Sequence, residues 1–399
     1  MRRRTSIAAA IAVTALTAGA VLAASSGAGD IRDDQAPSDK ITVSVQELSA
    51  AATGHAYEAW LVSDDGATKL SLGMVTPDNN ANATLEYVSP DGTNLIGAFN
   101  QLVITNEPSP DSDPAASDDV VASDTIPAGA LVHIRHLAAV WSSAPDGTGL
   151  STGTLSQSQT AAMHAGLAKE MADAGNLAGA KQHAEHIINI IVGSASSEFG
   201  DHDGNGTAQN PGDGYGLAVY ATGANQHAGL AAASADADTE VTVHGQHVVD
   251  TTANVMTWAD VLKGQARDIL AAADVAAAQT AATAAAATGT QILEGVDANG
   301  NGSVQPIPGE GGAMIAYEHS QLMAQFNLVF VESGAATPTA SPAPSTPAPT
   351  TPTPATGGTT LPATGGASGA PVGLIAGLVV LIAGAAGVFA MRWRARARA

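Results

Sequence analysis

The sequence has no cysteine, and aromatic residues make up only 4% of its 399 residues. The absence of cysteine excludes disulfide bonds, thiolate-ligated zinc, covalently attached c-type haem and thiol nucleophiles. Any metal in this protein must therefore be held by oxygen or imidazole ligands. The scarcity of aromatic residues, beside abundant Ala and Gly, predicts helices that pack through small side chains.

Basic residues are also few, with 15 Lys and Arg against 37 Asp and Glu and a net charge of −22. Every acidic side chain lies between Asp30 and Glu332, and only eight of the basic ones do. Such an acidic region repels nucleic-acid phosphates, which excludes a nucleic-acid-binding protein. Calcium and cationic partners remain compatible with it.

The N-terminus has three arginines, an uncharged run from Ile7 to Ala24 and small residues around Ala23. This order is typical of a secretory signal peptide over residues 1–24. The alternative is an uncleaved N-terminal anchor. Residues 334–360 consist almost wholly of Pro, Thr, Ser, Ala and Gly, a composition that predicts an extended stalk rather than a packed core.

The C-terminus combines the pentapeptide 361–365, an uncharged apolar run over 372–391 and an Arg-rich tail. About 20 apolar residues are enough for a transmembrane helix, and the arginines favour a cytoplasmic tail. The whole arrangement resembles the LPXTG sorting signal of Gram-positive surface proteins, carried here by Leu361, Pro362, Thr364 and Gly365. The resemblance implies cleavage by a sortase after Thr364 and attachment to peptidoglycan. An ordinary membrane anchor is the alternative, and both place the ectodomain outside the cell.

Residues 40–126 contain short β-like runs separated by turns such as Asp64-Asp65-Gly66 and Pro90-Asp91-Gly92. Several strands at this spacing predict an antiparallel β-sandwich. The expected strands are 41–45, 56–62, 70–75, 83–88 and 101–105.

Three segments of this unit carry a resemblance: Tyr57-Glu-Ala-Trp60-Leu-Val, Ser71-Leu-Gly73 and Leu102-Val-Ile-Thr105-Asn-Glu-Pro108. Together they resemble the C-terminal extracytoplasmic domain of anti-sigma-K factors. The resemblance implies a β-sandwich outside the membrane, coupled in that family to a cytoplasmic sigma-binding segment. No stretch of this chain predicted to face the cytoplasm is long enough to form such a segment, so we interpret the unit as an extracellular module.

Residues 127–333 change to helical periodicity with Ala-rich faces, which predicts an α-helical bundle and a multidomain α+β protein. Asn176 and Ser156 are expected N-caps. The expected helices are 131–141, 157–174, 177–192, 216–233, 246–273, 275–293 and 313–329.

A repeat of Asp, Asn and Gly occurs twice in this region, each time between two expected helices. Oxygen side chains at loop positions 1, 3, 5 and 9, with Gly at position 6, resemble the start of an EF-hand calcium loop. Position 12 departs from that pattern, because Gly212 and Pro308 occupy it. Turns that cap their own backbone are the alternative. The candidate calcium ligands are Asp201, Asp203, Asn205, Thr207, Gln209 and Asp213 in the first loop, and Asp297, Asn299, Asn301, Ser303, Gln305 and Glu310 in the second.

We single out seven histidines on expected helices, and two pairs of them have i,i+3 spacing, which places each pair on one helical face. Imidazoles that project inward from several helices can bind a transition metal or haem. The alternative is that they are ordinary hydrogen-bonded residues, and convergence of three or more would decide for a metal. The candidates are His133, His136, His164, His183, His186, His227 and His319.

The sequence contains no P-loop, nucleotide-binding glycine fingerprint or nucleophile elbow, so we expect a non-enzymatic protein. The leading hypothesis is a cell-surface structural, binding or sensing protein whose helical domain is stabilised by calcium. A transition-metal or haem-binding domain is the first alternative. The second is an anti-sigma-type sensor that acts with a separate cytoplasmic partner.

Overall fold

The computed structural model describes residues 25–331. The predicted signal peptide 1–24, stalk 334–360, sorting signal and span 372–391 lie outside these residues. Within residues 25–331, no helix is long and apolar enough to cross a membrane.

Eight antiparallel strands form one continuous sheet in the order β4-β3-β6-β7-β8-β1-β2-β5. The edge strands β4 and β5 also contact each other, so the sheet curls around its own core. The antiparallel β-structure predicted for residues 40–126 is confirmed, but one curled sheet replaces the expected pair of stacked sheets. The strands are β1 (Ser26–Arg32), β2 (Lys40–Gln46), β3 (His55–Val62), β4 (Lys69–Val75), β5 (Ala83–Val88), β6 (Gln101–Pro108), β7 (Val120–Thr125) and β8 (Phe326–Phe330).

Strands β1 and β8 lie outside the expected span 40–126, yet they are central to the sheet. β8 pairs with β1 on one side and with β7 on the other. The packing around Gly29 of β1 leaves no space for a side chain, because a Cβ there would lie 2.6 Å from Leu102 Cδ2. The expected helix 313–329 is wrong in its final third. The helix ends at Leu322, and residues from Phe326 onward pair as strand β8.

Three of the expected helices, 177–192, 216–233 and 275–293, agree with the structure to within one residue at each end, whereas those expected to begin at 157 and 246 begin seven residues earlier. The side chain of Asn176 accepts a hydrogen bond from the Gly179 backbone N–H, which confirms it as an N-cap. Ser156 instead lies inside a helix that begins at Leu150. The helices are α1 (Leu95–Ala98), α2 (Ala128–Ala138), α3 (Leu150–Asp173), α4 (Leu177–Val192), α5 (Leu217–Ala232), α6 (Thr239–Ala271), α7 (Val275–Glu294) and α8 (Ala313–Leu322), with a short 3-10 turn at Pro145–Gly147.

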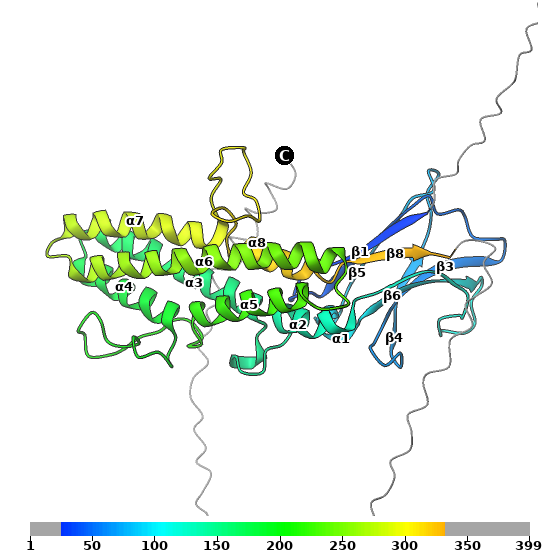
Figure 1. The fold of residues 1–399 in the computed structure, drawn as a ribbon, viewed down its shortest axis with the longest axis horizontal. Helices are drawn as coiled ribbons and strands as arrows, with labels where there is room; N and C mark the ends of the chain where they lie inside the picture. The colour runs from blue at the N-terminus through cyan, green and yellow to red at the C-terminus, as the bar shows by residue number, and fades with distance from the viewer. Residues whose placement is uncertain (1–24, 332–399) are drawn as a thin grey trace, which may run out of the picture. The chain divides into compact units, whose positions relative to one another are not determined.

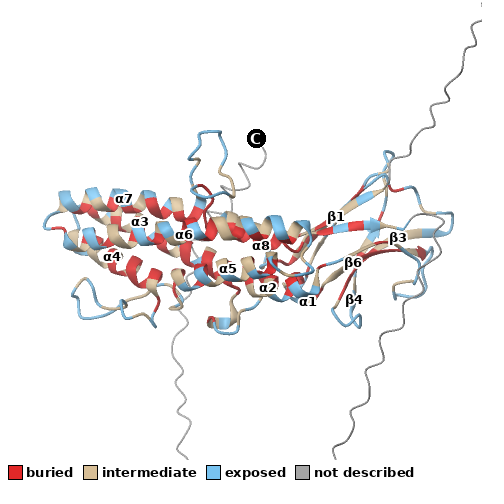
Figure 2. Ribbon diagram, viewed as in Figure 1, coloured by how far each residue is buried: buried red, intermediate tan, exposed pale blue. Residues whose placement is uncertain are grey.

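Two hydrophobic clusters fill the described residues. One joins sheet residues such as Ile31 and Ile104 to residues of α2, α5 and α6 and to Met323 and Ala324, which follow α8. The other is Ala-rich and lies among α3, α4, α6 and α7, which run alongside one another (Figure 1). Buried residues recur at intervals along these helices, with exposed residues between them (Figure 2). Alanine supplies more than half of the buried residues of this second cluster, as the Ala content predicted.

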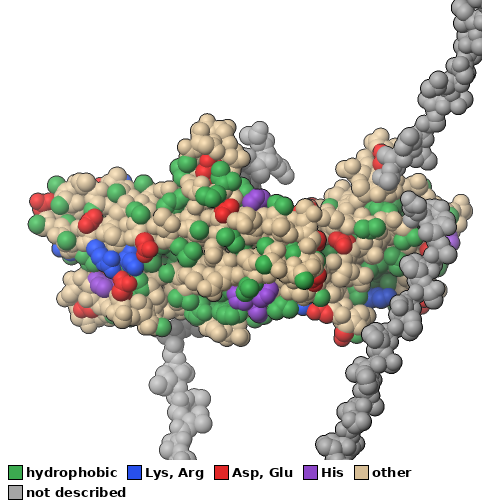
Figure 3. All heavy atoms as spheres, viewed as in Figure 1, with side chains coloured by type: hydrophobic (Ala, Val, Ile, Leu, Met, Phe, Trp, Pro, Cys, Tyr) green, Lys and Arg blue, Asp and Glu red, His purple; other side chains and the backbone are tan. Residues whose placement is uncertain are grey.

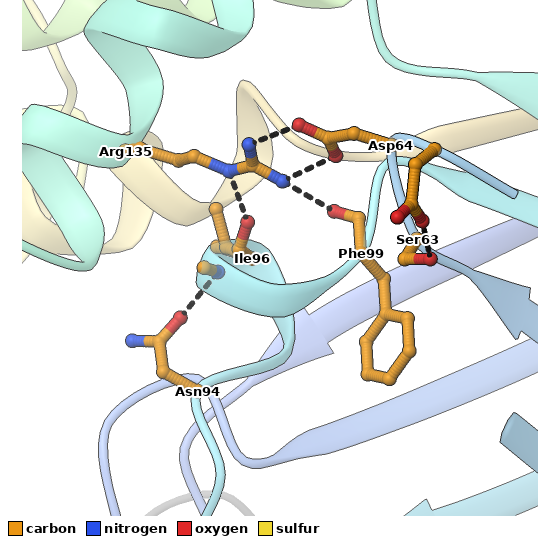
Figure 4. Close-up of polar contacts among 8 residues, drawn as sticks. Ser63, Asp64, Asn94, Ile96, Phe99 and Arg135 are labelled. Atoms are coloured by element: carbon orange, nitrogen blue, oxygen red, sulfur yellow. Dashed lines mark hydrogen bonds and ion pairs between the residues drawn. The ribbon is translucent and has the colours of Figure 1, made fainter. Parts of the chain in front are cut away.

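Arg135 fixes α2 against the sheet (Figure 4). Its guanidinium donates two hydrogen bonds to the Asp64 carboxylate, at 2.6 and 2.7 Å, and a third to the Ile96 carbonyl at 3.0 Å. The Asn94 side chain, which caps α1, also donates to the Ala138 carbonyl at the end of α2. Because bidentate arginine–carboxylate pairs are geometrically specific, this contact sets the orientation of α2.

Candidate functional site: three histidine trios

Nine histidines converge into three groups of three. In each group, two histidines of i,i+3 spacing come from one helix and one comes from another helix. Within a group, one potential ligand atom from each residue lies within 4.8 Å of the others. We call them cluster 1 (His133 and His136 of α2 with His227 of α5), cluster 2 (His183 and His186 of α4 with His164 of α3) and cluster 3 (His244 and His247 of α6 with His319 of α8).

The Nδ1 atoms face one another in all three clusters. In cluster 1, His227 Nδ1 lies 3.0 Å from His133 Nδ1 and 3.1 Å from His136 Nδ1. In cluster 2, His164 Nδ1 lies 3.0 Å and 3.2 Å from its two partners. In cluster 3, the same distances from His319 Nδ1 are 2.7 Å and 3.3 Å.

These spacings match nitrogens that share one metal ion. With metal–nitrogen bonds of about 2.0–2.1 Å, two ligands lie about 2.9 Å apart at a right angle and about 3.4 Å apart at the tetrahedral angle. The Nδ1–Nδ1 distances of 2.7–3.3 Å in the three clusters are close to that interval. Each trio therefore has the dimensions of a three-imidazole metal site.

Hydrogen bonding among the rings does not account for this geometry. An imidazole Nδ1 carries either one proton or one in-plane lone pair, so it forms one good hydrogen bond at a time. The single histidine of each trio instead has two Nδ1 neighbours at about hydrogen-bond distance. A cation between the three nitrogens would use all three lone pairs at once.

Burial lowers the pKa of six of these imidazoles and so favours their neutral form, which is the form that binds metals. Burial, with the neighbouring histidines His186 and His183, lowers the pKa of His164 to about 3. Burial, with His244 and His247, lowers the pKa of His319 to about 3. Burial is also the largest cause of the lowered pKa values of His136, His183, His227 and His244.

Cluster 1 is partly exposed and bordered by an aromatic ring. The ring centroid of Trp141 lies 5.0 Å from those of His136 and His227. The Trp141 indole N–H donates to the Tyr215 hydroxyl at 3.0 Å, which fixes the indole in place. Figure 3 shows histidine side chains gathered on the surface over α2 and α5, where this cluster lies.

Polar residues contact the far side of the rings in the other two clusters. In cluster 2, His186 Nε2 lies 2.9 Å from Gln209 Oε1. In cluster 3, His244 Nε2 lies 3.2 Å from the Glu240 carboxylate, which also accepts a hydrogen bond from Asn327 of β8. Partners of this kind orient a metal-binding imidazole and select the nitrogen that faces the metal.

All seven histidines singled out from the sequence lie in these clusters. His244 and His247 were missed, although their i,i+3 spacing equals that of the two pairs that were recognised. The recurrence of His-x-x-His on a third helix was the signal that could have found them. His55 on β3 and His202 in the loop after α4 are outside the trios.

The first Asp/Asn/Gly loop wraps around its own carboxylates and one buried glutamate from α4. Asp201 accepts hydrogen bonds from the backbone of Gly204 and Gly206. Glu185, which is fully buried, accepts from the backbone N–H of Asp203, and ligand atoms of Glu185, Asp201 and Asp203 lie within 4.8 Å of one another. Asn205 Oδ1 accepts from the Thr207 backbone. Sequence reasoning missed Glu185 as a member of this loop.

Asp213 and Glu310, the acidic residues that follow position 12 of the two loops, behave differently. Asp213 does not join the first loop, because its carboxylate accepts from the Tyr220 hydroxyl and the Tyr215 backbone. Glu310 does join the second loop, where it is 2% exposed and accepts from the backbone of Asn299 and Gln305. Asp297 accepts from Gly300 and Gly302, as Asp201 does in the first loop, and Asn301 accepts from the Ser303 backbone. Calcium at either loop stays a prediction.

The fold and these clusters define an α+β protein with a curled antiparallel sheet and a helical region that carries three histidine trios. Residues 2–121 match the family model described as the C-terminal domain of anti-sigma-K factor rskA. The match supports the resemblance of the N-terminal module and ends before the first histidine trio. No curated protein and no solved structure matches the chain.

Proposed function

We propose that this protein binds divalent transition-metal ions, zinc or copper, at the three histidine trios. The convergence of nine imidazoles from six helices, with their Nδ1 atoms 2.7–3.3 Å apart around the single histidine of each trio, carries this proposal. For this reason we propose transition-metal binding, rather than calcium binding, as the leading function.

The ligand set favours some metals over others. Imidazole suits zinc, copper, nickel and iron, whereas magnesium and calcium prefer oxygen ligands. The clusters contain no thiolate, because the chain has no cysteine. Haem fits poorly, since three nitrogens about 3 Å apart leave no room for a porphyrin ring between them.

Binding rather than catalysis is the simpler interpretation of three similar sites in one chain. Three protein ligands leave a coordination position for water or an exchangeable ligand, which allows ions to be taken up and released. We propose that the ectodomain acts outside the cell, held there by its C-terminal sorting signal, and buffers, carries or senses the metal without an enzymatic reaction.

Titration of the metal-free chain with Co²⁺ tests this proposal, because cobalt bound to imidazoles absorbs visible light and zinc displaces it. Absorbance that rises to saturation at three equivalents and falls on addition of Zn²⁺ is the expected result. Spectra identical to Co²⁺ in buffer would contradict the proposal.

Calcium binding at the first Asp/Asn/Gly loop is a second candidate, favoured by the approach of Glu185 to Asp201 and Asp203. Affinity of about 0.1–1 mM would suffice outside a cell. We expect millimolar Ca²⁺ to raise the melting temperature, with Mg²⁺ as the control. An unchanged melting curve would remove this candidate.

The family match of residues 2–121 favours a sensing role for the N-terminal module. In this version of the function, metal binding to the helical region is the signal and a separate cytoplasmic partner reads it. Deleting the gene should then abolish the response of a sigma-dependent transcriptional reporter to added zinc or copper. An unaltered response would leave the protein as a metal-binding module alone.

A further inference from the structure

Gln209, at the ninth position of the first Asp/Asn/Gly loop, lies against α4 beside cluster 2. Its backbone N–H donates to Glu185 Oε1 at 2.7 Å. Its backbone carbonyl accepts from Asn189 Nδ2 at 2.8 Å. Glu185 and Asn189 are both fully buried on α4, so they fix the main chain of Gln209 to the helix that carries two ligands of cluster 2.

The side chain of Gln209 reaches the far side of a histidine ring. Gln209 Oε1 accepts from Gln182 Nε2 at 3.0 Å and lies 2.9 Å from His186 Nε2. Because a carbonyl oxygen can only accept, a hydrogen bond at this contact requires the proton of His186 on Nε2. Its Nδ1 then carries a lone pair directed toward His164 Nδ1, 3.2 Å away.

We propose that Gln209 is a positioning residue for the metal at cluster 2, acting through His186. It holds the imidazole in the tautomer and orientation in which Nδ1 binds the ion. The first loop thereby contributes to cluster 2. This inference rests on the proposed function, because it assumes that cluster 2 binds a metal.

The second loop provides an internal comparison. Gln305 occupies the same ninth position, but its Oε1 accepts from the side chains of Asn299 and Asn301. Its backbone N–H donates to Glu310, as that of Gln209 donates to Glu185. The two glutamines therefore share their loop position and their backbone contact, and they differ in the histidine contact.

Zinc affinity of the full chain, measured by competition with a chromophoric chelator, tests the inference. The parent carries His227→Ala and His319→Ala, so that cluster 2 is the one complete trio among the described residues. Removing a partner of a metal-binding histidine costs about 10- to 100-fold in affinity. We expect Gln209→Ala to show such a loss, Gln305→Ala to match the parent, and Gln209→Glu to bind at least as tightly, because a carboxylate also accepts from Nε2–H.

The outcomes separate this inference from the proposed function. An unaltered chain that binds no zinc would overturn both. A parent that binds no zinc, when the unaltered chain does bind it, would overturn the inference and leave the proposed function to clusters 1 and 3. A parent that binds one zinc, with Gln209→Ala and Gln305→Ala equally tight, would overturn the inference alone. If Gln209→Ala fails to fold, as circular dichroism would show, Gln209→Glu decides: a folded Gln209→Glu that binds tenfold more weakly than the parent would overturn it.

Discussion

The single histidine of each trio is the residue on which the site depends most. His164 is 6% exposed, and its Nδ1 lies between those of His183 and His186. Its low pKa means that protons compete poorly with a metal for this nitrogen. Truncating it removes the ligand shared by both short contacts of the trio.

We therefore expect His164→Ala to reduce the number of bound zinc ions from three to two, with the remaining two unchanged in affinity. His55→Ala, at an exposed position on β3, is the matched control and should retain three. Elemental analysis of the dialysed proteins gives the counts. Retention of three ions by His164→Ala would contradict zinc binding at cluster 2.

At the scale of elements, the His-x-x-His pairs were readable from the sequence because helical periodicity puts them on one face. Which of His227, His164 and His319 completes which pair could not be read, because these three come from other helices and only packing brings them to a pair. The sheet shows the same limit. Alternation predicted five of its strands, whereas β1, with glycines at positions 27 and 29, has weak β-propensity and forms through pairing with β2 and β8.

Cluster 1 depends on the orientation of α2, because His133 and His136 are both on this helix. Arg135, which lies between them in the sequence, sets that orientation. Replacing Arg135 with Met should lower zinc affinity at cluster 1 and leave the other two sites unchanged. Loss of its charged hydrogen bonds should also cost roughly 1–3 kcal/mol of folding free energy. Titration calorimetry and urea unfolding measure the two effects.

Arg267→Met is the control, since Arg267 is 54% exposed in a surface pair with Glu198 and should cost less than about 1 kcal/mol. Equal effects of the two substitutions on zinc binding would show that Arg135 does not position cluster 1.

For the molecule as a whole, burying neutral imidazoles links folding to pH. The folded-state pKa of His164 and of His319 is about 3, below the ordinary histidine value of 6.5 that we expect in the unfolded chain. Between these values the unfolded state binds more protons, so stability is fully present above pH 6.5 and is lost progressively as pH falls toward 3.

Metal-free protein should thus unfold at lower urea concentration at pH 5 than at pH 7.5. This window lies above the ordinary pKa values of carboxylates, so the histidines dominate the change. A His164→Ala, His319→Ala variant should lose less stability over the same interval. An equal loss in that variant would assign the pH dependence to other groups.

The count of bound metal ions tests the central claim most directly. The full chain, loaded with Zn²⁺ or Cu²⁺ and dialysed, should retain three ions by elemental analysis. The variant His164→Ala, His227→Ala, His319→Ala, which lacks the single histidine of each trio, should retain none. Absence of retained metal in the unaltered chain, or equal retention by the variant, would contradict the account.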